Sequence, residues 1–549
     1  MACQRGITLT STILKLLESI IGARIEPIIR IDCTPLQGGG KKGEAAEEYI
    51  FIMQTIIDAN KQERKSSKFI ITDVEKAFDQ AWRIGVFHNL VKRGIKGEIL
   101  DLLWRLNNNI LARIKYDTQM HSEEFEVEES LRQGGGLSAI FYAQHVGSVV
   151  EDLEEKRYGR KIGSIKIPAV AWQDDVTLIP NDKEEEKCMI KEFEVSTEKN
   201  RVKLAIKKKT HVLTVGKEDH EITVMKGKVL KETVEAKVLG YTYNDKGNAN
   251  THLEKKETES ISMMATMGLS LSEANMDRIF VPSLLILYKK CFVKKLLYGL
   301  AGIPLTQQCW EKIGIIDRKV LRNFLNLPSS APTIGLYNEY GIIPIKYRLY
   351  QRKLGMWKRI NREETNNVIK ECKREQINKE LPWFKELVAI ANELKVDLEE
   401  AKYVSKEVWK RKVSKSVFEK VKRDFMEGMG NLRRYSNNAK DETVPGKMKR
   451  YMKFTQRKAK VWMRARLDLL DPAPRRPYRI DNIWNCKFCD SNEQSTEHYI
   501  VHCQGVNDIF SGIDRKRFFE HIQTLEMSNE HLTEATKNLT KLYNRLVEG

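Results

Sequence analysis

The segment Ala171–Ile179 constrains the fold more than any other part of the chain. It reads Ala-Trp-Gln-Asp-Asp-Val-Thr-Leu-Ile, so two adjacent carboxylates interrupt apolar, β-prone residues, and the preceding run Ile165–Val170 is also β-prone. This pattern predicts a tight β-hairpin with Asp174 and Asp175 at its tip. Adjacent acids repel each other, which favours a divalent cation between them.

A third carboxylate follows another apolar run, Phe69–Thr72, at Asp73. Three acids at two strand ends are enough to hold two Mg²⁺ ions for phosphoryl transfer. Taken singly, an Asp at a strand end is more often a cap, and an Asp-Asp pair is more often a turn. Together, in a basic protein, they favour a metal site.

The charge of the chain points to a polyanionic partner. The 549 residues are 31% charged, with a formal net charge of +19 at pH 7. Nucleic acid is the first candidate, and the alternative is a generally basic surface. No apolar run approaches the ~18 residues of a membrane span, and the N-terminus has no signal-peptide core. Six of the nine cysteines are scattered singly, as in a reducing compartment, so we expect an intracellular protein.

The order of strand-like and helix-like patterns predicts a mixed first half and a helical second half. Up to about residue 245 the fold class is α+β, built on a small and largely antiparallel sheet. From 251 to about 470 the pattern is almost entirely helical, and the linker Asp471–Pro477 then leads to a short Cys/His segment and a helical tail. The expected helices are 12–25, 45–57, 85–107 with one break, 137–155 and 183–202; the expected strands are 69–72, 111–116, 124–128, 211–215 and 238–243.

A Cys/His cluster lies near the C-terminus. Cys486, Cys489, His498 and Cys503 follow the spacing C-x2-C-x8-H-x4-C. Three thiolates and one imidazole at this spacing suit tetrahedral Zn²⁺. His502 is the alternative to His498, although the spacing to Cys503 favours His498. A zinc that is purely structural and a zinc that serves nucleic-acid binding both remain open.

The stretch from Gly446 to Arg466 is basic and contains no acid. Basic residues fall along one expected helical stripe, with aromatic residues interleaved, which favours nucleic-acid binding over the alternative of a solvated helix face. The residues of the stripe are Lys449, Lys453, Arg457, Lys460 and Arg464.

Several short motifs, in one order, resemble the reverse transcriptase domain of non-LTR (LINE-type) retrotransposons. Asp73–Trp82 resembles D-v-x-k-A-F-D-x-v, and Leu131–Ser138 resembles R-Q-G-C-P-L-S. Trp172–Asp175 stands where the family has its aromatic-x-D-D box. Weaker matches are Arg5–Thr10, Gln37–Gly43, Lys209-Thr210 and Val238–Tyr241, followed by the thumb-like segments Leu296–Gly299, Arg318–Arg322 and Glu339–Ile345.

The resemblance implies the roles of the metal-binding residues. Asp73, Asp174 and Asp175 would be catalytic and, together with Val74, would hold two Mg²⁺ ions ~3.5–4 Å apart. Lys209 would donate a proton to the leaving pyrophosphate. The alternative for Lys209 is a solvated lysine within Lys207–Lys209.

The resemblance also implies substrate contacts. Arg5 would bind the triphosphate, and Phe78 would be a steric gate against the ribose 2′-hydroxyl, or else a core residue. Arg132, Gln133 and Gly134 would lie under the template and the incoming nucleotide, Gly134 by permitting close backbone approach. The chain departs from the family at Trp172-Gln173 and at Gly135-Gly136.

The resemblance implies a right-hand polymerase. The expected parts are fingers and palm (1–250), a helical thumb (251–350), a basic helical nucleic-acid-binding extension (351–475), a CCHC zinc knuckle (480–510) and a helical tail (511–549). The implied function is RNA-directed DNA polymerase, with template RNA, primer DNA and deoxynucleoside triphosphates as partners and no membrane.

The sequence leaves two alternative functions open. One is a diverged relic that only binds nucleic acid, and the other is a group II intron maturase, which the knuckle and thumb segments fit less well. Arg5 stands close to Met1 and only a short tail follows Cys503. We therefore expect a truncated form that lacks the endonuclease domain and acts in the nucleus, with the cytoplasm as the alternative site.

Overall fold

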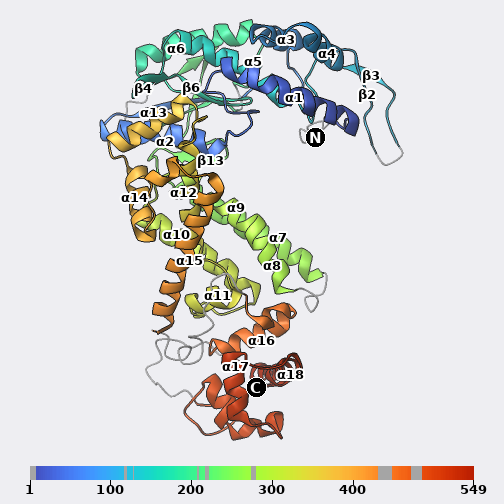
Figure 1. Cartoon of the computed structure of the whole chain (residues 1–549), viewed down its shortest axis with the longest axis vertical. Helices are drawn as coiled ribbons and strands as arrows, with labels where there is room; N and C mark the ends of the chain where they lie inside the picture. Colours follow the sequence, from blue (N-terminus) through green and yellow to red (C-terminus); the bar gives the residue numbers. More distant parts are fainter. Residues whose placement is uncertain are drawn as a thin grey trace. The chain divides into compact units, whose positions relative to one another are not determined.

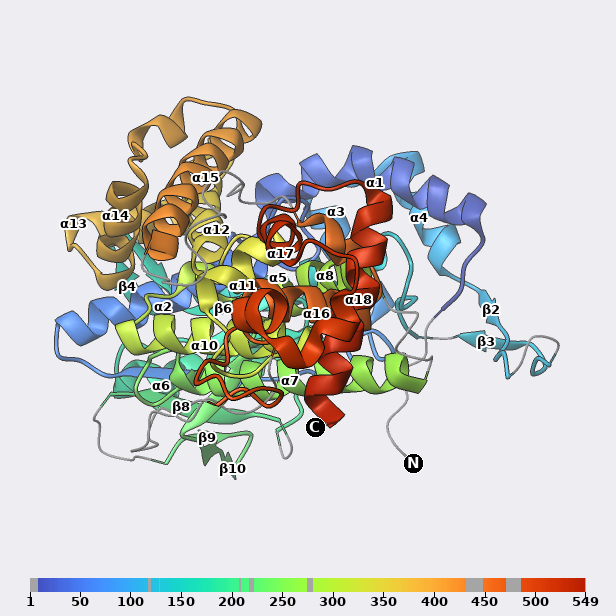
Figure 2. The ribbon, with the colours of Figure 1, turned by 90° about the horizontal axis from the view of Figure 1, so that it is seen from below.

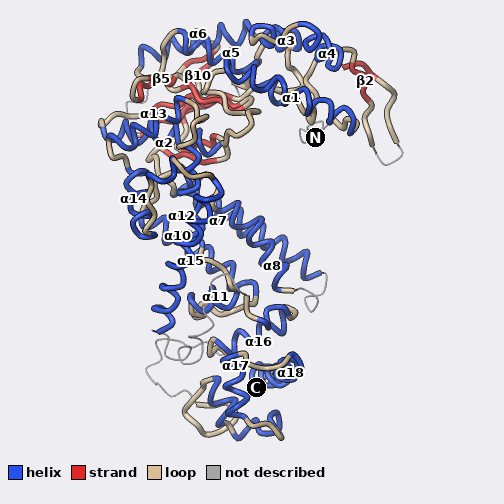
Figure 3. The backbone as a smooth tube through the Cα atoms, in the orientation of Figure 1, coloured by secondary structure: helices blue, strands red, loops and turns tan. Residues whose placement is uncertain are grey.

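The computed structural model describes residues 8–116, 120–127, 129–206, 209–216, 222–273, 280–430, 448–470 and 485–548. The chain divides into two compact units. The sheet unit comprises residues 1–252, 299–305 and 356–388, and the helical unit comprises 253–298, 306–355 and 389–549. The strands of the described residues all lie in the sheet unit (Figure 3). Among the described residues, no helix is both long enough and apolar enough to cross a bilayer.

The sheet unit is built on a five-stranded sheet with the order β11-β8-β1-β7-β6. Its neighbours are antiparallel except for β11 and β8. The strands of this sheet are β1 (Ser67–Thr72), β6 (Ala169–Trp172), β7 (Asp175–Leu178), β8 (His211–Val215) and β11 (Lys231–Glu232). The expected α+β class is therefore confirmed for this part of the chain.

Helices cover both faces of this sheet. Strand β1 is buried along its whole length except at half-buried Lys68, which a strand open to water on one face would not be. Figure 1 shows α5 (Ser138–Glu155) and α6 (Lys183–Lys199) above the sheet and α2 (Ala46–Gln62) below it.

In α5, buried His145 lies with its Nδ1 atom 3.4 Å from the Asn89 side chain. Burial lowers the pKa of His145 to about 4.

The remaining elements of the sheet unit surround this core. Two of them, β2 and β3, form an antiparallel hairpin at its outer end (Figure 1, Figure 2). The elements are α1 (Thr12–Asp32), α3 (Arg83–Lys92), α4 (Gly97–Asn107), β2 (Ile110–Ala112), β3 (Phe125–Val127), β4 (Arg160–Ile162), β5 (Ile165–Ile167), β9 (Val224–Met225), β10 (Lys228–Val229), β12 (Glu235–Val238), β13 (Tyr241–Asn244), η3 (Leu300–Gly302) and α13 (Asn367–Asn378).

Several expected elements differ from the structure in their bounds, and two of them differ most. The helix expected over 12–25 continues to Asp32, with Pro27 inside it. The strand expected over 238–243 is wrong, because the segment is the hairpin β12–β13. Its turn residues Leu239 and Gly240 both have positive φ, 52° and 78°, as a two-residue hairpin turn demands. The apolar residues on either side of this turn imitate one continuous strand in the sequence.

The helical unit contains helices and loops in its described part (Figure 3). Helices α12 and α14 belong to both units, because the division of the chain falls inside them. The elements are α7 (Asn250–Glu273), α8 (Val281–Leu287), η2 (Tyr288–Phe292), α9 (Val293–Leu296), α10 (Gln307–Phe324), α11 (Thr333–Tyr340), α12 (Ile345–Ile360), α14 (Pro382–Leu394), η4 (Glu399–Lys402), α15 (Lys406–Gly430), η6 (Arg450–Lys453), α16 (Gln456–Arg466), η7 (His498–His502), η8 (Gln504–Phe510), α17 (Arg515–Thr524) and α18 (Asn529–Glu548).

Buried polar groups hold these helices together. The hydroxyls of Tyr288 and Tyr337 donate to the carboxylate of fully buried Asp317, at 2.6 and 2.7 Å. Burial raises the pKa of Asp317 to about 6, although both hydroxyls oppose this shift. Buried Arg466 in α16 donates to both carboxylate oxygens of Glu339 in α11, at 3.1 and 3.0 Å. Each buried charge is thereby hydrogen-bonded, which its burial requires.

The predicted domain boundaries at 250 and 350 remain predictions. The compact unit that contains the sheet also takes up residues 299–305 and 356–388. Trp383 illustrates this packing, because its indole donates to the carbonyl of Ala301 at 2.8 Å within the same unit. Neighbouring residues in the sequence therefore do not always belong to the same unit.

Candidate functional site

The predicted acidic hairpin is present in the structure. Strands β6 and β7 pair from Ala169↔Leu178 to Trp172↔Asp175, which leaves Gln173 and Asp174 as the two turn residues. Gln173 has a positive φ of 58°. The exposed Asp175 opens β7, and Asp174 is half-buried. The turn thus carries both acids at one end of the sheet.

The third acid lies at the same end of the sheet. Strands β1 and β7 are antiparallel neighbours, with Thr72 opposite Val176. The Thr72 hydroxyl donates to the Val176 carbonyl at 2.8 Å and so stabilises the pairing of β1 with β7 at this end. Asp73 directly follows Thr72, and Asp175 directly precedes Val176, so both acids lie at the same end of the β1–β7 pair. Acids that are a hundred residues apart in the sequence thereby become neighbours.

The backbone at Asp73 is fixed by a short antiparallel bridge between Val74 and Leu204. The amide of Ala205 donates to the Asp73 carbonyl, and the amide of Glu75 donates to the Lys203 carbonyl, both at 2.8 Å. These two bonds flank Val74, so its own carbonyl is not used in the bridge. A valine can ligate a metal only through that carbonyl, which is an oxygen of the kind that Mg²⁺ prefers.

Lys209 contacts the same carboxylate. Its Nζ lies 2.8 Å from Asp73 Oδ2. The turn that carries Lys209 also contains Ala205, because the Lys209 and Thr210 amides both donate to the Ala205 carbonyl. The segment that pairs with the Asp73 backbone therefore also directs the ammonium to the Asp73 side chain. Lys207 and Lys208 lie outside the described residues.

Tyr142 is a site residue that the sequence did not reveal. It is buried on α5, and its ring centroid lies 4.9 Å from that of Phe78. Burial raises the pKa of the Tyr142 hydroxyl, and the charges of Asp174 and Asp73 raise it further. Within an apolar helix a tyrosine looks like an ordinary core residue, so nothing in the sequence distinguishes it. Phe78 itself is half-buried beside it.

The Phe78 loop is joined to the predicted substrate-binding loop. The Leu131 amide donates to the Phe78 carbonyl at 2.8 Å, and the Thr8 amide donates to the Gln133 carbonyl at 2.8 Å. Gly134 has a φ of +113°, and a Cβ there would lie 2.9 Å from the Thr8 carbonyl oxygen. Glycine is therefore required at 134 by this contact within the protein, and the approach of Gly134 to the template stays a prediction. Arg5, the expected triphosphate ligand, lies outside the described residues.

Arg132 is buried, and its Nη2 nitrogen bonds to groups of the protein. Its Nη2 donates to Glu18 Oε1 at 3.0 Å and to the Leu106 carbonyl at 2.9 Å. The other oxygen of Glu18 accepts the Gly136 amide at 2.6 Å. Arg132 and Glu18 thereby tie the loop to α1, which favours a positioning role. Direct contact between substrate and Arg132 or Gln133 stays a prediction.

The Cys/His cluster has the geometry of a metal site. The ligand atoms of Cys486, Cys489, His498 and Cys503 all lie within 4.8 Å of one another, and across the described parts of the chain no other such group is found. Cys486 Sγ is 3.5 Å from Cys503 Sγ, and Cys489 Sγ is 3.4 Å from His498 Nε2. Exposed His502 is outside the group, so the choice of His498 over His502 is supported.

The loops around this cluster are held locally. The Ser491 amide that donates to the Cys489 sulfur lowers the pKa of this thiol, which favours the thiolate that a metal binds. Arg515 donates to the carbonyls of Tyr499 and Cys503, at 3.1 and 2.8 Å, and so fixes the turn after His498. Gly505 is required here, because a Cβ would lie 2.2 Å from the Phe488 carbonyl oxygen.

The predicted basic stripe is wrong at two positions. Lys449 and Arg464 are buried, 6% and 7% exposed, and the Arg464 guanidinium donates to the carbonyls of Leu469 and Asn326. The helix begins only at Gln456, after the 3₁₀ turn η6, so the assumed helical spacing from 449 onward does not hold. Lys453 and Arg457 are exposed, and Lys460 is half-buried.

The aromatic residues of this stretch belong to the core. Tyr451 and Trp462 are fully buried and stack on each other with ring centroids 5.6 Å apart. They are therefore not free to stack on bases, as the interleaved pattern suggested. Lys460 and Arg464 both lie 5.5 Å from the ring centroid of Tyr543 in α18, where their charges face an aromatic ring of the protein itself.

Part of the chain is similar to known proteins. Residues 2–243 match the family described as "Reverse transcriptase (RNA-dependent DNA polymerase)". The chain is 23% identical over 179 residues to the "Retrovirus-related Pol polyprotein from type-1 retrotransposable element R2" of Popillia japonica. That alignment covers 32% of this chain and 25% of the polyprotein.

A solved structure of telomerase from Candida albicans, in complex with a fragment of telomeric RNA, matches with 13% identity. The match covers 66% of this chain and 56% of that chain, with a TM-score of 0.28, so the two do not superpose as a whole. The order of the motifs, the acidic hairpin and the family match agree with one another. Residues 2–243 are therefore similar to the reverse transcriptase domains of non-LTR retrotransposons.

Proposed function

We propose that this chain is an RNA-directed DNA polymerase that copies RNA into DNA by adding nucleotides to a primer 3′-hydroxyl. One observation carries the proposal. Strands β1 and β7 pair so that Asp73 and the Asp174-Asp175 turn lie at the same end of one sheet. Within a reverse transcriptase domain, this is the arrangement that template-directed nucleotidyl transfer requires.

The residues at this end of the sheet fit two Mg²⁺ ions. Asp73, Asp174 and Asp175 supply carboxylate oxygens, and Val74 supplies a carbonyl that its backbone bridge does not use. Bound there, the ions would lower the pKa of the primer hydroxyl and neutralise charge on the α-phosphate. By fixing the ions, the acids would align the primer 3′-oxygen with the α-phosphate. The bond from the 3′-oxygen to the α-phosphorus would then form as the bond to pyrophosphate breaks.

The neighbouring side chains supply the other functions. Lys209, whose ammonium is 2.8 Å from Asp73, donates a proton to the leaving pyrophosphate. Phe78 faces the sugar of the incoming nucleotide and rejects a 2′-hydroxyl, with Tyr142 supporting its ring. The loop at Gly134 lies beneath the template, and Arg5 binds the triphosphate.

We infer a right-hand arrangement of these parts. The five-stranded sheet with α5 and α6 is the palm, and α1 with its neighbours belongs to the fingers. The helices from α7 onward include the thumb. Template RNA, primer DNA and deoxynucleoside triphosphates are the proposed partners, and the nucleus is the proposed place of action.

We infer that Cys486, Cys489, His498 and Cys503 hold one Zn²⁺. Their compact geometry supports this, since structural zinc sites are tetrahedral and built from thiolates and imidazoles. A zinc that only stabilises the fold remains the alternative to a knuckle that also binds nucleic acid. Exposed Lys453 and Arg457 are the residues of the basic stripe that suit phosphate contacts.

Primer extension tests the polymerase proposal. The assay uses a DNA primer annealed to an RNA template, with deoxynucleoside triphosphates and Mg²⁺. Wild type should extend the primer, and Asp174→Asn should lose activity by on the order of 10²–10³-fold or more, because it removes a metal-binding charge. Asp79→Asn is the matched control. Asp79 is an exposed acid that directly follows Phe78, in the loop after Asp73.

Two results would contradict the polymerase proposal. One is a wild type that binds the primer–template without extending it, which would favour a relic that only binds nucleic acid. The other is equal extension by wild type and Asp174→Asn.

A further inference from the structure

The turn that carries Asp174 is conformationally demanding. Gln173 has a φ of +58°, a region in which a residue with a Cβ costs roughly 1–2 kcal/mol. Glycine or asparagine would adopt this conformation more readily. Because Asp174 and Asp175 follow directly, any relaxation at Gln173 would move both carboxylates. Something in the surrounding structure must therefore hold the backbone of Gln173.

Gln37 holds that backbone directly. Its side chain is fully buried, and its carboxamide bonds to both backbone groups of Gln173. Nε2 donates to the Gln173 carbonyl at 3.1 Å, and Oε1 accepts the Gln173 amide at 2.9 Å. Oε1 also accepts the Gly39 amide at 2.9 Å. One carboxamide thus imitates the pairing that a neighbouring strand would give to the turn.

The glycines after Gln37 make room for the turn. A Cβ at Gly38 would lie 2.8 Å from the Trp172 ring, and a Cβ at Gly39 would lie 2.3 Å from the Gln173 amide nitrogen. The backbone also pairs here, because the Gly38 amide donates to the Ala171 carbonyl at 3.0 Å. The bulky Trp172-Gln173 pair, unusual for the family, therefore fits because this loop has no side chains at these positions.

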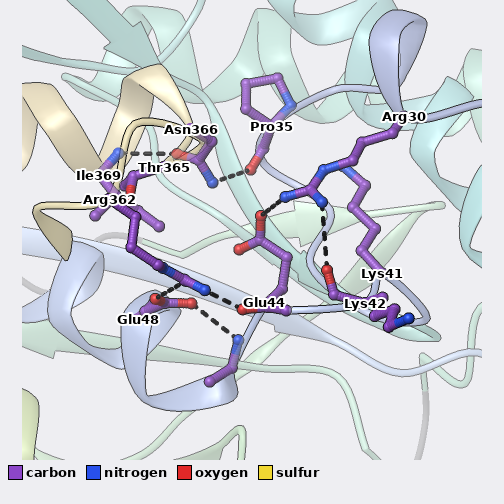
Figure 4. A network of polar contacts seen from close by, with 12 residues as sticks. Arg30, Pro35, Lys41, Lys42, Glu44, Glu48, Arg362, Thr365, Asn366 and Ile369 are labelled. Carbon is purple, nitrogen blue, oxygen red and sulfur yellow. Dashed lines mark hydrogen bonds and ion pairs between the residues drawn. The ribbon is translucent and has the colours of Figure 1, made fainter. Parts of the chain in front are cut away.

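The far end of the same loop is anchored by charged residues (Figure 4). Arg362 donates to the Gly43 carbonyl at 3.2 Å and to Glu48 Oε1 at 3.3 Å. On the other side, Lys41 donates to the Thr34 carbonyl at 2.7 Å, and Arg30 donates to the Lys42 carbonyl at 3.4 Å. The loop is thus fixed at both ends within the sheet unit, so Gln37 acts from a rigid support.

We propose that Gln37 is a positioning residue that sets the place of the Asp174 and Asp175 carboxylates. The proposal rests on the proposed function, because it assumes that these carboxylates bind the catalytic metal. We assign Gln37 no contact with substrate. Its removal leaves the acids present but allows the turn to relax, so cation affinity and the rate of the chemical step fall together.

Two variants of Gln37 test the proposal against a matched control. Gln37→Ala removes all three hydrogen bonds, whereas Gln37→Glu keeps the acceptor and loses the donor to the Gln173 carbonyl. The control is Gln376→Ala, because Gln376 is equally buried in the same unit and bonds through its side chain to Thr55 and Phe384 rather than to the turn. Thermal unfolding of each variant shows whether the fold is retained.

The first measurement is the Mg²⁺ dependence of primer extension. A misplacement of about 1 Å can cost on the order of 10²-fold in rate. Gln37→Ala should therefore lower the extension rate at saturating nucleotide by roughly 10-fold or more and raise the Mg²⁺ concentration for half-maximal rate. Gln37→Glu should fall between Gln37→Ala and wild type. Primer–template affinity should stay at its wild-type value, and Gln376→Ala should keep the wild-type Mg²⁺ dependence.

The second measurement needs no polymerase activity. Tb³⁺ is a hard cation that takes oxygen ligands, and Trp172 stands two residues from Asp174, so excitation of tryptophan reports Tb³⁺ bound at the turn. Asp175→Asn identifies the part of the signal that comes from this site. Gln37→Ala should weaken Tb³⁺ binding by several-fold, and Gln376→Ala should not.

The two measurements separate the possible outcomes. Equal Mg²⁺ and Tb³⁺ dependence in Gln37→Ala and Gln376→Ala would overturn the proposal, as would a Tb³⁺ signal that Asp175→Asn leaves unchanged. If wild type extends no primer but Gln37→Ala still weakens Tb³⁺ binding, the positioning role of Gln37 stands while the polymerase proposal fails.

Discussion

The two candidate metal sites are assembled over very different distances along the chain. The Cys/His cluster takes its ligands from Cys486 to Cys503, and loops of the same segment fix them. The acidic site joins Asp73 to Asp174 and Asp175 through the pairing of β1 with β7. Its supports come from three further segments of the chain, at Gln37, Lys209 and Tyr142.

We therefore expect different kinds of substitution to disrupt the two sites. A site made from one short segment depends on its ligands and on the metal itself, since metal binding and local folding are coupled. A site made from paired strands depends on backbone contacts that hold like charges near one another. The first should fail when a ligand is changed, and the second should also fail when a residue that never touches a metal is changed.

The largest effect should come from removing a zinc ligand. Structural zinc contributes about 10–16 kcal/mol of binding free energy in small domains. Cys486→Ser should abolish zinc binding and lower the thermal stability of the C-terminal segment, as measured by metal content and unfolding. His502→Ala is the control and should keep one zinc per chain, because His502 lies outside the cluster. Zinc loss in the His502 variant alone would reverse the ligand assignment.

Two buried groups, one in each unit, should make opposite contributions to stability as the pH changes. Burial lowers the pKa of His145 in the sheet unit to about 4, so only the unfolded state takes up this proton between pH 6.5 and 4, and stability falls as pH falls. Burial raises the pKa of Asp317 in the helical unit to about 6, so the folded state keeps its proton, and stability falls as pH rises from 3.8 to 6. Each contribution is roughly 3 kcal/mol across its window.

Hydrogen exchange in each unit, corrected for intrinsic rates, measures these slopes. His145→Gln should change the slope of the sheet unit only, and Asp317→Asn should change that of the helical unit only and in the opposite sense. A variant that leaves its own unit's slope unchanged, or that changes the other unit's slope, would show that burial does not control these two groups.

Lys209 tests whether a charge or a proton is needed beside Asp73. General acid catalysis is worth about 10²–10⁴-fold, so Lys209→Ala should slow single-nucleotide incorporation by roughly 10²-fold. Lys209→Arg keeps the positive charge but cannot release a proton at neutral pH, so it should be nearly as slow. Full rescue by arginine would assign Lys209 a purely electrostatic role at the Asp73 carboxylate.

Gly134 should give the smallest effect of the set. A side chain there meets both the positive φ and the Thr8 carbonyl, which together cost on the order of 1–3 kcal/mol. Gly134→Ala should therefore lower template-dependent extension with a modest loss of stability. Gly227→Ala also has a positive φ but meets nothing within 4 Å, so its activity should match wild type. Equal losses in both variants would mean that the contact with Thr8 is irrelevant.

Local sequence was sufficient wherever the structure depends on nearby residues. The hairpin at Asp174-Asp175 and the Cys/His cluster are both defined by short segments whose turn and ligand chemistry is visible in the sequence. Pairing of β1 with β7 could be inferred only through the family resemblance, because the sequence alone does not fix which strands are neighbours.

The remaining features depend on packing that no local pattern records. Buried Glu18 and Tyr142 look like ordinary helix residues until the fold brings partners to them, and the family resemblance includes Gln37 without giving it a role. Arg464 shows the converse, because a basic residue in an apparent stripe can turn inward when backbone carbonyls are there to accept its hydrogens. At Lys449 the predicted stripe does not hold because the helix begins only at Gln456.

Metal binding at the acidic hairpin tests the central claim most directly. Mn²⁺ can stand in for Mg²⁺ at oxygen sites, and electron paramagnetic resonance measures the free ion. We expect wild type and Cys486→Ser to bind Mn²⁺ with the same affinity. Asp73→Asn and Asp174→Asn should bind Mn²⁺ at least about tenfold more weakly, with their zinc content unchanged. Equal Mn²⁺ binding by wild type and both Asp variants would contradict the assignment of these acids as the catalytic metal centre.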